Sequence, residues 1–96
     1  MLRNKSIIQK DMSKCYVCGT NQGLHIHEIY YGVSNRKKSI RYGCYVSLCG
    51  KHHNLSKYGV HYDKALDRSL KEECQKEFEK EYSRERFIQI FGKSYL

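Results

Sequence analysis

The chain contains no proline, no glycine- or serine-rich stretch and no long apolar run. Without a linker-like, repeated or low-complexity segment, nothing marks an internal boundary in the 96 residues, so we expect one domain. A membrane helix needs about 20 largely apolar residues, and no such run is present. The first ten residues are charged and lack the apolar core of a signal peptide, so we expect a cytoplasmic protein without a membrane segment.

Apolar material is also scarce for a free-standing fold. The hydrophobic fraction of 40% includes nine tyrosines, and the mean hydropathy is −0.77. A chain of this length buries only about 60 to 65% of its unfolded surface, so its core needs additional stabilisation. Five cysteines are present. In a reducing compartment they are expected to bind metal rather than form disulfides.

Positive charge dominates the chain. Eighteen lysines and arginines stand against ten acidic residues, which gives a formal charge of +8. Most of the excess lies in residues 1–62, whereas the acidic residues gather between Asp63 and Glu85. This balance is typical of nucleic-acid-binding proteins, so we expect a basic face on the half that carries most of the cysteines and the histidines.

We divide the chain into a basic lead-in (residues 1–14), a core that carries the histidines and all cysteines but one (15–62), and a helical extension packed on it (63–96). A strand is expected over residues 24–31, which are rich in β-branched and aromatic types, and a second strand over 45–48. Together with the helices described next, these strands predict an α+β fold.

The remaining segments are assigned from helix and turn signals. Residues 34–39 are polar and basic and are expected to form a loop, whereas residues 52–58 are expected to form a short helix that Gly59 ends. Apolar residues then recur with the spacing of four that predicts one buried helix face: Leu66, Leu70, Cys74, Phe78 and Tyr82. Ser83 resembles the N-cap of a last helix that ends at Gly92. That helix is expected to bury three residues: Phe87, Ile88 and Phe91.

Two residue pairs have the spacing of zinc ligands. Cys15 and Cys18 form one, and Cys49 and His52 form the other. Four such ligands complete a tetrahedron, and structural zinc contributes about 10 to 16 kcal/mol in small finger peptides, enough to stabilise a thin core. Cys44 is an alternative to His52 as the fourth ligand, although no partner lies near it in the sequence.

The 30 residues between these pairs exceed the roughly 12 to 20 of a usual zinc finger, so they must carry something more. They contain His25, His27 and Glu28 on the first predicted strand. Alternation places the two histidines on one face and Glu28 on the other, unless a bulge turns them together. If the zinc ligands hold the two strands antiparallel, the helix that follows places His53 against His27.

This ordered set resembles the HNH endonuclease family, and in particular small HNH proteins of phages and prophages in Gram-positive bacteria. The resemblance covers about residues 15–96. Its motifs are Cys15-x-x-Cys18, His27-Glu28-Ile29-Tyr30-Tyr31-Gly32, Asn35-Arg36-Lys37-Lys38-Ser39, Tyr42-Gly43, Leu48-Cys49-x-x-His52-His53-Asn54, Gly59-Val60-His61 and Phe91-Gly92-Lys93-Ser94-Tyr95-Leu96.

The resemblance implies a ββα-metal (His-Me finger) core in which a hairpin and a helix hold one divalent ion, Mg²⁺ or Mn²⁺. By position, His27 and His53 are ligands of this ion, Glu28 stands where the family has its general base, and His61 is a candidate further ligand. Neutral imidazoles and a partly hydrated cation suit phosphodiester hydrolysis.

Three basic residues between the strands, Arg36, Lys37 and Lys38, are candidates for binding DNA phosphates. Contacts of this kind carry no base information, so we expect little sequence preference and a steep dependence on salt.

At the base position the chain departs from the family, which more often has a second histidine there. A carboxylate with a pKa of about 4.3 is a weak base near neutral pH unless burial raises it. Three interpretations stay open. Glu28 is the base; or His25 or His27 takes that role with the ligands rearranged; or the site binds metal and DNA without efficient cleavage.

Two functions are therefore predicted. The first is a metal-dependent DNA endonuclease or nickase of low sequence specificity, acting in phage or prophage DNA metabolism inside the bacterial host. The alternative is a zinc-stabilised DNA-binding module, weakly catalytic at most, that acts in recombination or packaging.

Overall fold

Two short antiparallel strands form the centre of the protein, whose computed structural model describes residues 5–96. Strand β1 (Leu24–Glu28) pairs with β2 (Tyr45–Cys49), with Leu24 opposite Cys49 and Glu28 opposite Tyr45. Both predicted strands are confirmed, but β1 ends at Glu28 and not at Tyr31. Every residue of β2 is buried, so this strand lies in the interior of the protein.

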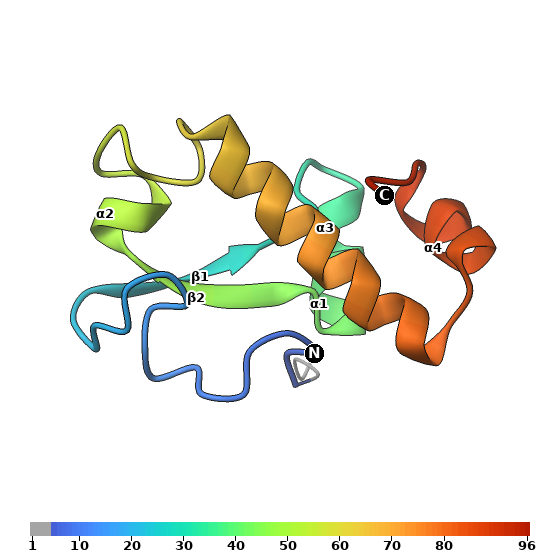
Figure 1. Ribbon diagram of the computed structural model, residues 1–96, viewed down its shortest axis with the longest axis horizontal. Coiled ribbons are helices and arrows are strands. Elements are labelled where there is room, and N and C mark those ends of the chain that lie inside the picture. Colours follow the sequence, from blue (N-terminus) through green and yellow to red (C-terminus); the bar gives the residue numbers. More distant parts are fainter. Residues whose placement is uncertain (1–4) are drawn as a thin grey trace.

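Within residues 5–96, four helices accompany the strand pair, which makes the protein a small α+β fold. In chain order they are α1 (Asn35–Tyr42), α2 (Gly50–His53), α3 (Lys64–Glu81) and α4 (Arg84–Phe91). Figure 1 shows α3 crossing the strand pair, with α2 near one end of this long helix and α4 near the other. None of the helices within residues 5–96 is both long and apolar enough to cross a bilayer.

The N-terminal segment runs along the free edge of β2. The Ser47 backbone N–H donates to the Gln9 side chain (2.8 Å), and the Ser47 carbonyl accepts from the Tyr16 N–H (2.8 Å). The Ser6 hydroxyl donates to the Tyr45 carbonyl. These bonds satisfy an edge that would otherwise be open to other strands. Residues 5–14 contain no helix, and residues 1–4 of the predicted basic lead-in lie outside the described residues.

The predicted loop at residues 34–39 is wrong, because α1 occupies this stretch. The sequence of α1 has no clear apolar stripe, because the residue that this helix buries is a serine. Ser39 is fully buried, donates to the Tyr30 carbonyl (2.7 Å) and accepts from the Tyr30 N–H (3.1 Å). Gly43 ends the helix in the left-handed conformation (φ 75°), which favours glycine.

The helix predicted over residues 52–58 is also placed wrongly. It begins at Gly50 and ends at His53, after which the chain turns back on itself. The backbone N–H of Val60 donates to the His52 carbonyl (2.8 Å). Gly59 does not end a helix but permits this return, because a Cβ at Gly59 would lie 2.7 Å from the His53 carbonyl oxygen.

Both C-terminal helices begin at a side-chain cap. Ser83, the predicted cap, accepts the Arg86 N–H at the start of α4, and Asp63, which was not predicted as a cap, accepts hydrogen bonds from the first turn of α3. One face of α4 differs from the prediction, because Ile88 is 39% exposed and Ile90 is buried instead. The face of α3 is confirmed at its centre, whereas Tyr82 at its end is half exposed.

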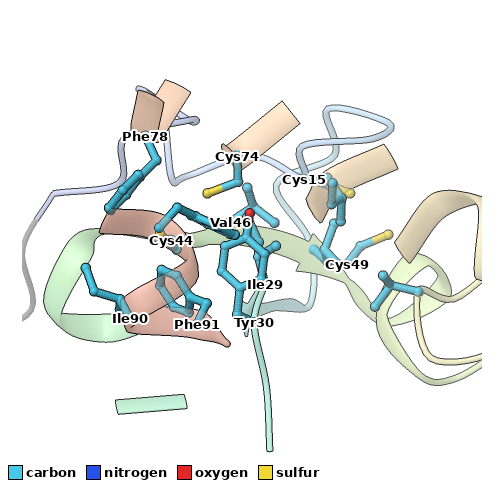
Figure 2. Close-up of a cluster of buried hydrophobic side chains, with 14 residues drawn as sticks. Cys15, Ile29, Tyr30, Cys44, Val46, Cys49, Cys74, Phe78, Ile90 and Phe91 are labelled. Carbon is cyan, nitrogen blue, oxygen red and sulfur yellow. The ribbon is translucent and has the colours of Figure 1, made fainter. Parts of the chain in front are cut away.

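The core combines aromatic, aliphatic and cysteine side chains. Tyr30 packs against Phe87 and Phe91 with ring centroids 5.1 and 4.5 Å apart. Figure 2 shows the aromatic side chains at one end of the cluster and Cys15 and Cys49 at the other. A cluster of cysteines therefore adjoins the apolar core.

Gln75 fixes the C-terminal tail against α3. It is fully buried; its oxygen accepts the Tyr95 N–H (2.7 Å), and its amide donates to the Ser94 hydroxyl (3.0 Å). We expect Gln75→Ala to lower the free energy of unfolding by about 1 to 3 kcal/mol, because it removes a buried side chain and leaves the partly buried Tyr95 N–H without its partner. Urea denaturation tests this, with the exposed Gln89→Ala on α4 as a control that leaves stability unchanged.

Candidate metal centres

The two predicted zinc-ligand pairs meet in one cluster. Cys15, Cys18, Cys49 and His52 each offer a ligand atom, and these atoms lie within 4.8 Å of one another. The first two come from a tight turn, closed by a bond from the Gly19 N–H to the Cys15 carbonyl. The last two come from the end of β2 and from α2. We call these four residues the sulfur cluster.

The spacing of the donor atoms fits a tetrahedral ion. The sulfur atoms of Cys18 and Cys49 are 3.7 Å apart, and Nδ1 of His52 lies 3.3 Å from Cys49 and 3.8 Å from Cys15. A zinc tetrahedron with sulfur bonds of about 2.3 Å and nitrogen bonds of about 2.0 Å has edges of about 3.5 to 3.8 Å. The cysteines are all free, and a separation of 3.7 Å is far longer than a disulfide bond. The sulfur cluster can therefore hold a metal ion.

Cys15 is also prepared electrostatically to act as a thiolate. Its burial opposes ionisation, but the backbone N–H groups of Cys49, Cys18 and Val17 point at the sulfur and outweigh that effect. They lower the pKa of Cys15 to about 6. The thiolate is the form that binds metal.

Cys44, the alternative fourth ligand, lies elsewhere. It is fully buried at the start of β2 and packs against Cys74 from α3. The hydrogen bond to Cys74 and burial both raise the pKa of the Cys44 thiol, which keeps it protonated. This residue belongs to the core and not to the sulfur cluster.

A second group consists only of histidines: His27 from β1, His53 from α2 and His61 from the returning loop. The Nε2 atoms of His53 and His61 are 3.2 Å apart, and the His27 ring centroid lies 5.4 Å from that of His53 and 5.3 Å from that of His61. We call these three residues the histidine cluster. The structure therefore brings together the strand and helix histidines, as predicted, together with His61, the candidate further ligand.

His27 carries an unpaired polar atom. Its side chain is 3% exposed, and Nε2 has no hydrogen-bond partner among the described residues. Burial, then the neighbouring His53 and His61, lower the pKa of His27 to about 3, so its ring is neutral at pH 7. An unpaired buried nitrogen is costly in a folded protein, and a bound cation would remove that cost.

His25 is exposed and contacts His53, but it is not one of the three members of the histidine cluster. Its Nδ1 lies 3.0 Å from Nδ1 of His53, which confirms that His25 and His27 share one strand face. One of these nitrogens must donate and the other accept. If Nδ1 of His53 is the donor, Nε2 of its neutral ring carries no hydrogen and is free to bind a metal ion. A hydrogen bond from the ring nitrogen that does not bind the metal is the usual way in which a metal-binding histidine is oriented.

The histidine cluster opens into a hollow of about 390 Å³. Glu28 and Arg36 line it and form an ion pair, with Oε1 3.7 Å from Nε. The Glu28 side chain is only 16% exposed, whereas that of Arg36 is 66% exposed. Lys37 and Lys38 follow on α1 but are not among the residues that line the hollow.

Two residues near this hollow were not predicted as site residues. Tyr31 lines it, with its ring centroid 5.9 Å from that of His27, and its hydroxyl donates to Asp67. Lys71 from α3 lies over the Tyr31 ring at 4.4 Å. Tyr31 lies in one of the quoted motifs but was given no role there, and Lys71 lies in none, because its approach to Tyr31 depends on how α3 crosses the strands.

No family model, curated protein or solved structure matches this chain. The chemistry of the two clusters is therefore inferred from their own donor atoms. One offers three sulfurs and one nitrogen around a closed centre, and the other offers three nitrogens beside an open, partly charged hollow. Closed tetrahedral sites are typical of structural ions, whereas catalytic sites keep an open position.

Proposed function

We propose that the protein is a metal-dependent endonuclease of the ββα-metal (HNH) kind that hydrolyses DNA phosphodiester bonds with little sequence preference. The observation that carries this proposal is the unpaired, buried Nε2 of His27, which faces two further imidazoles at the edge of an open hollow. In the histidine cluster, β1 supplies His27 and α2 supplies His53, as in a hairpin-and-helix metal site, whereas His61 comes from the returning loop.

In this proposal the sulfur cluster binds structural zinc. Its mixed thiolate and imidazole donors suit Zn²⁺, and an ion there ties the N-terminal turn to the end of β2. That link keeps β1 and β2 in register, and it fixes the start of α2, which carries His53.

The histidine cluster would hold Mg²⁺ or Mn²⁺, with His27, His53 and His61 as ligands. Such an ion stabilises negative charge on a phosphate and lowers the pKa of water. Glu28 is proposed as the general base, because it lines the same hollow and the three histidine nitrogens converge on one another. Arg36 holds its carboxylate in place. Arg36, Lys37 and Lys38 then bind backbone phosphates, which accounts for a lack of base specificity.

Supercoiled plasmid provides the test. We expect nicks with Mg²⁺ or Mn²⁺, none without added divalent ion, and none with EDTA. Binding of the plasmid without nicks under every ionic condition would overturn the enzyme and favour the alternative, a zinc-stabilised DNA-binding module.

Glu28→Gln tests the base directly. Glutamine keeps the size of the side chain but cannot take a proton, so we expect the nicking rate to fall about a hundredfold, the lower range for general base catalysis. Affinity for DNA, measured without divalent ions, should stay within about twofold, since the base contributes to the reaction and not to binding. Unchanged nicking would show that His25 or another group removes the proton.

A further inference from the structure

A second hollow, with a volume of about 430 Å³, adjoins the hollow beside the histidine cluster. The two hollows share Tyr31 and His61 in their walls. The second hollow is lined mainly by the first half of α3 and by the C-terminal tail. Helix α3 lies in the part of the chain in which acidic residues are concentrated. Apart from His61, a ligand of the proposed catalytic ion, the second hollow contains none of the residues assigned above to a metal ion or to DNA binding.

The lining of this hollow is strongly positive despite the acidic residues nearby. Four cationic side chains face it and only one carboxylate, that of Asp67: the cations are Lys64, Arg68, Lys71 and Lys93. The excess of three positive charges over a concave surface attracts an anion more strongly than the same charges dispersed on a flat one.

Lys71 is held rigidly at the back of the hollow. Its side chain is only 14% exposed, and Nζ lies 2.9 Å from Asp67 and 3.4 Å from the Tyr31 hydroxyl. The ammonium also lies over two rings, at 4.4 Å from the centroid of Tyr31 and 5.4 Å from that of Tyr95. These contacts fix the charge in advance, so an anion binding there does not have to order a flexible lysine.

The tail side of the hollow is fixed too. Lys93 lies with Nζ 5.1 Å from the Tyr95 ring centroid, and the Tyr95 backbone is bonded to the buried Gln75. The hollow therefore has cations on both walls, one set from α3 and one from the tail.

We propose that this hollow binds a second backbone phosphate of the nucleic-acid strand whose neighbouring phosphodiester lies at the histidine cluster. The inference rests on the proposed function for the identity of the strand. Because Tyr31 and His61 line both hollows, the two hollows lie next to each other, as sites for neighbouring phosphates of one strand must and a site for a free anion need not. Lys64, Arg68 and Lys93 would contact the phosphate at the rim, with Lys71 beneath.

The test compares two double variants of equal charge. Arg68→Gln with Lys93→Gln removes two cations of the hollow. Lys80→Gln with Lys76→Gln is the matched control, because Arg68 and Lys80 each form one exposed ion pair on α3 and Lys76 is exposed on the same helix. Fluorescence anisotropy with a short labelled DNA duplex, without added Mg²⁺ or Mn²⁺, gives the affinity at several salt concentrations.

We expect the first variant to bind about tenfold more weakly, as for loss of a charged hydrogen-bonding contact. Its plot of log affinity against log salt should be shallower by about one unit, the value for one lost phosphate contact. The control should stay within about twofold of the unchanged protein. Equal behaviour of the two variants would overturn the proposal.

Two further outcomes distinguish failure of the proposed phosphate site from failure of the proposed nuclease activity. If the unchanged protein nicks DNA but the two variants bind alike, the second phosphate site fails and the nuclease stands. If nothing is nicked but the first variant binds weakly with a reduced salt slope, the nuclease fails and the phosphate site stands.

Inorganic phosphate distinguishes a strand from a free anion. Titrated at constant ionic strength, it should shift the backbone NMR signals of Lys93 and Tyr95 much less than duplex DNA at the same phosphate concentration. Equal shifts with both would identify a free-anion pocket and overturn the proposal.

Discussion

His27→Ala is expected to lower the rate of plasmid nicking about a thousandfold, which corresponds to about 4 kcal/mol of lost charge stabilisation at the phosphate. The substitution removes a buried nitrogen that has no hydrogen-bond partner among residues 5–96, and it leaves the histidine cluster with two ligands. The protein should still fold, because the nitrogen that is lost is unsatisfied in the described part of the chain; truncating this buried side chain removes packing contacts but leaves the backbone pairing of β1 with β2 in place. The nicking rate with Mn²⁺ and the far-UV circular dichroism spectrum measure the two properties separately.

A second variant tests whether the loss of nicking in His27→Ala comes from the lost metal ligand and not from a packing defect. His61 is exposed on the returning loop, so His61→Ala removes a ligand with little effect on packing, and we expect the same direction of change. Tyr62→Ala is the matched control: this neighbouring side chain is 66% exposed and points to no cluster, and nicking should be unchanged. Full activity in both histidine variants would remove the histidine cluster from the reaction.

Cys18→Ser is expected to unfold most of the protein. Cys18 is exposed, so replacing its sulfur with oxygen costs little packing, and any large effect must come from the metal. A structural zinc contributes about 10 to 16 kcal/mol, comparable with or larger than the whole stability of a typical domain. We expect loss of cooperative thermal unfolding, and the same loss when a chelator removes zinc from the unchanged protein.

Cys44→Ala is the control for this effect. It truncates a fully buried thiol outside the sulfur cluster, so it should lower stability by a packing contribution alone and leave one tightly bound zinc per chain. Native mass spectrometry reports that zinc content for both variants. A folded, zinc-free Cys18→Ser protein would contradict a structural role for the sulfur cluster.

Local sequence signals predicted a good part of the fold. The zinc-ligand spacings located the sulfur cluster because each pair lies on one turn, where spacing determines geometry. Strand alternation placed His25 and His27 on one face for the same reason. The caps Ser83 and Gly92 were also found correctly, since side-chain capping and left-handed glycine are local effects.

What the sequence did not predict depends on long-range packing. Helix α1 was missed because its buried contact is made by a serine bonded to the Tyr30 backbone, which gives no apolar stripe. The return of the chain at Gly59 brings His61 beside His53, a contact that helical spacing does not anticipate. Lys71 reaches the site only because α3 crosses the strands, so the second hollow has no signature in the sequence.

A crystal structure of the protein grown with zinc and soaked in Mn²⁺, with anomalous data collected at the absorption edges of both metals, tests the two-cluster account most directly. It predicts a zinc peak among Cys15, Cys18, Cys49 and His52, and a separate manganese peak bound by His27, His53 and His61. Absence of any cation from the histidine cluster, with the sulfur cluster filled, would contradict a catalytic site and leave a metal-stabilised binding protein.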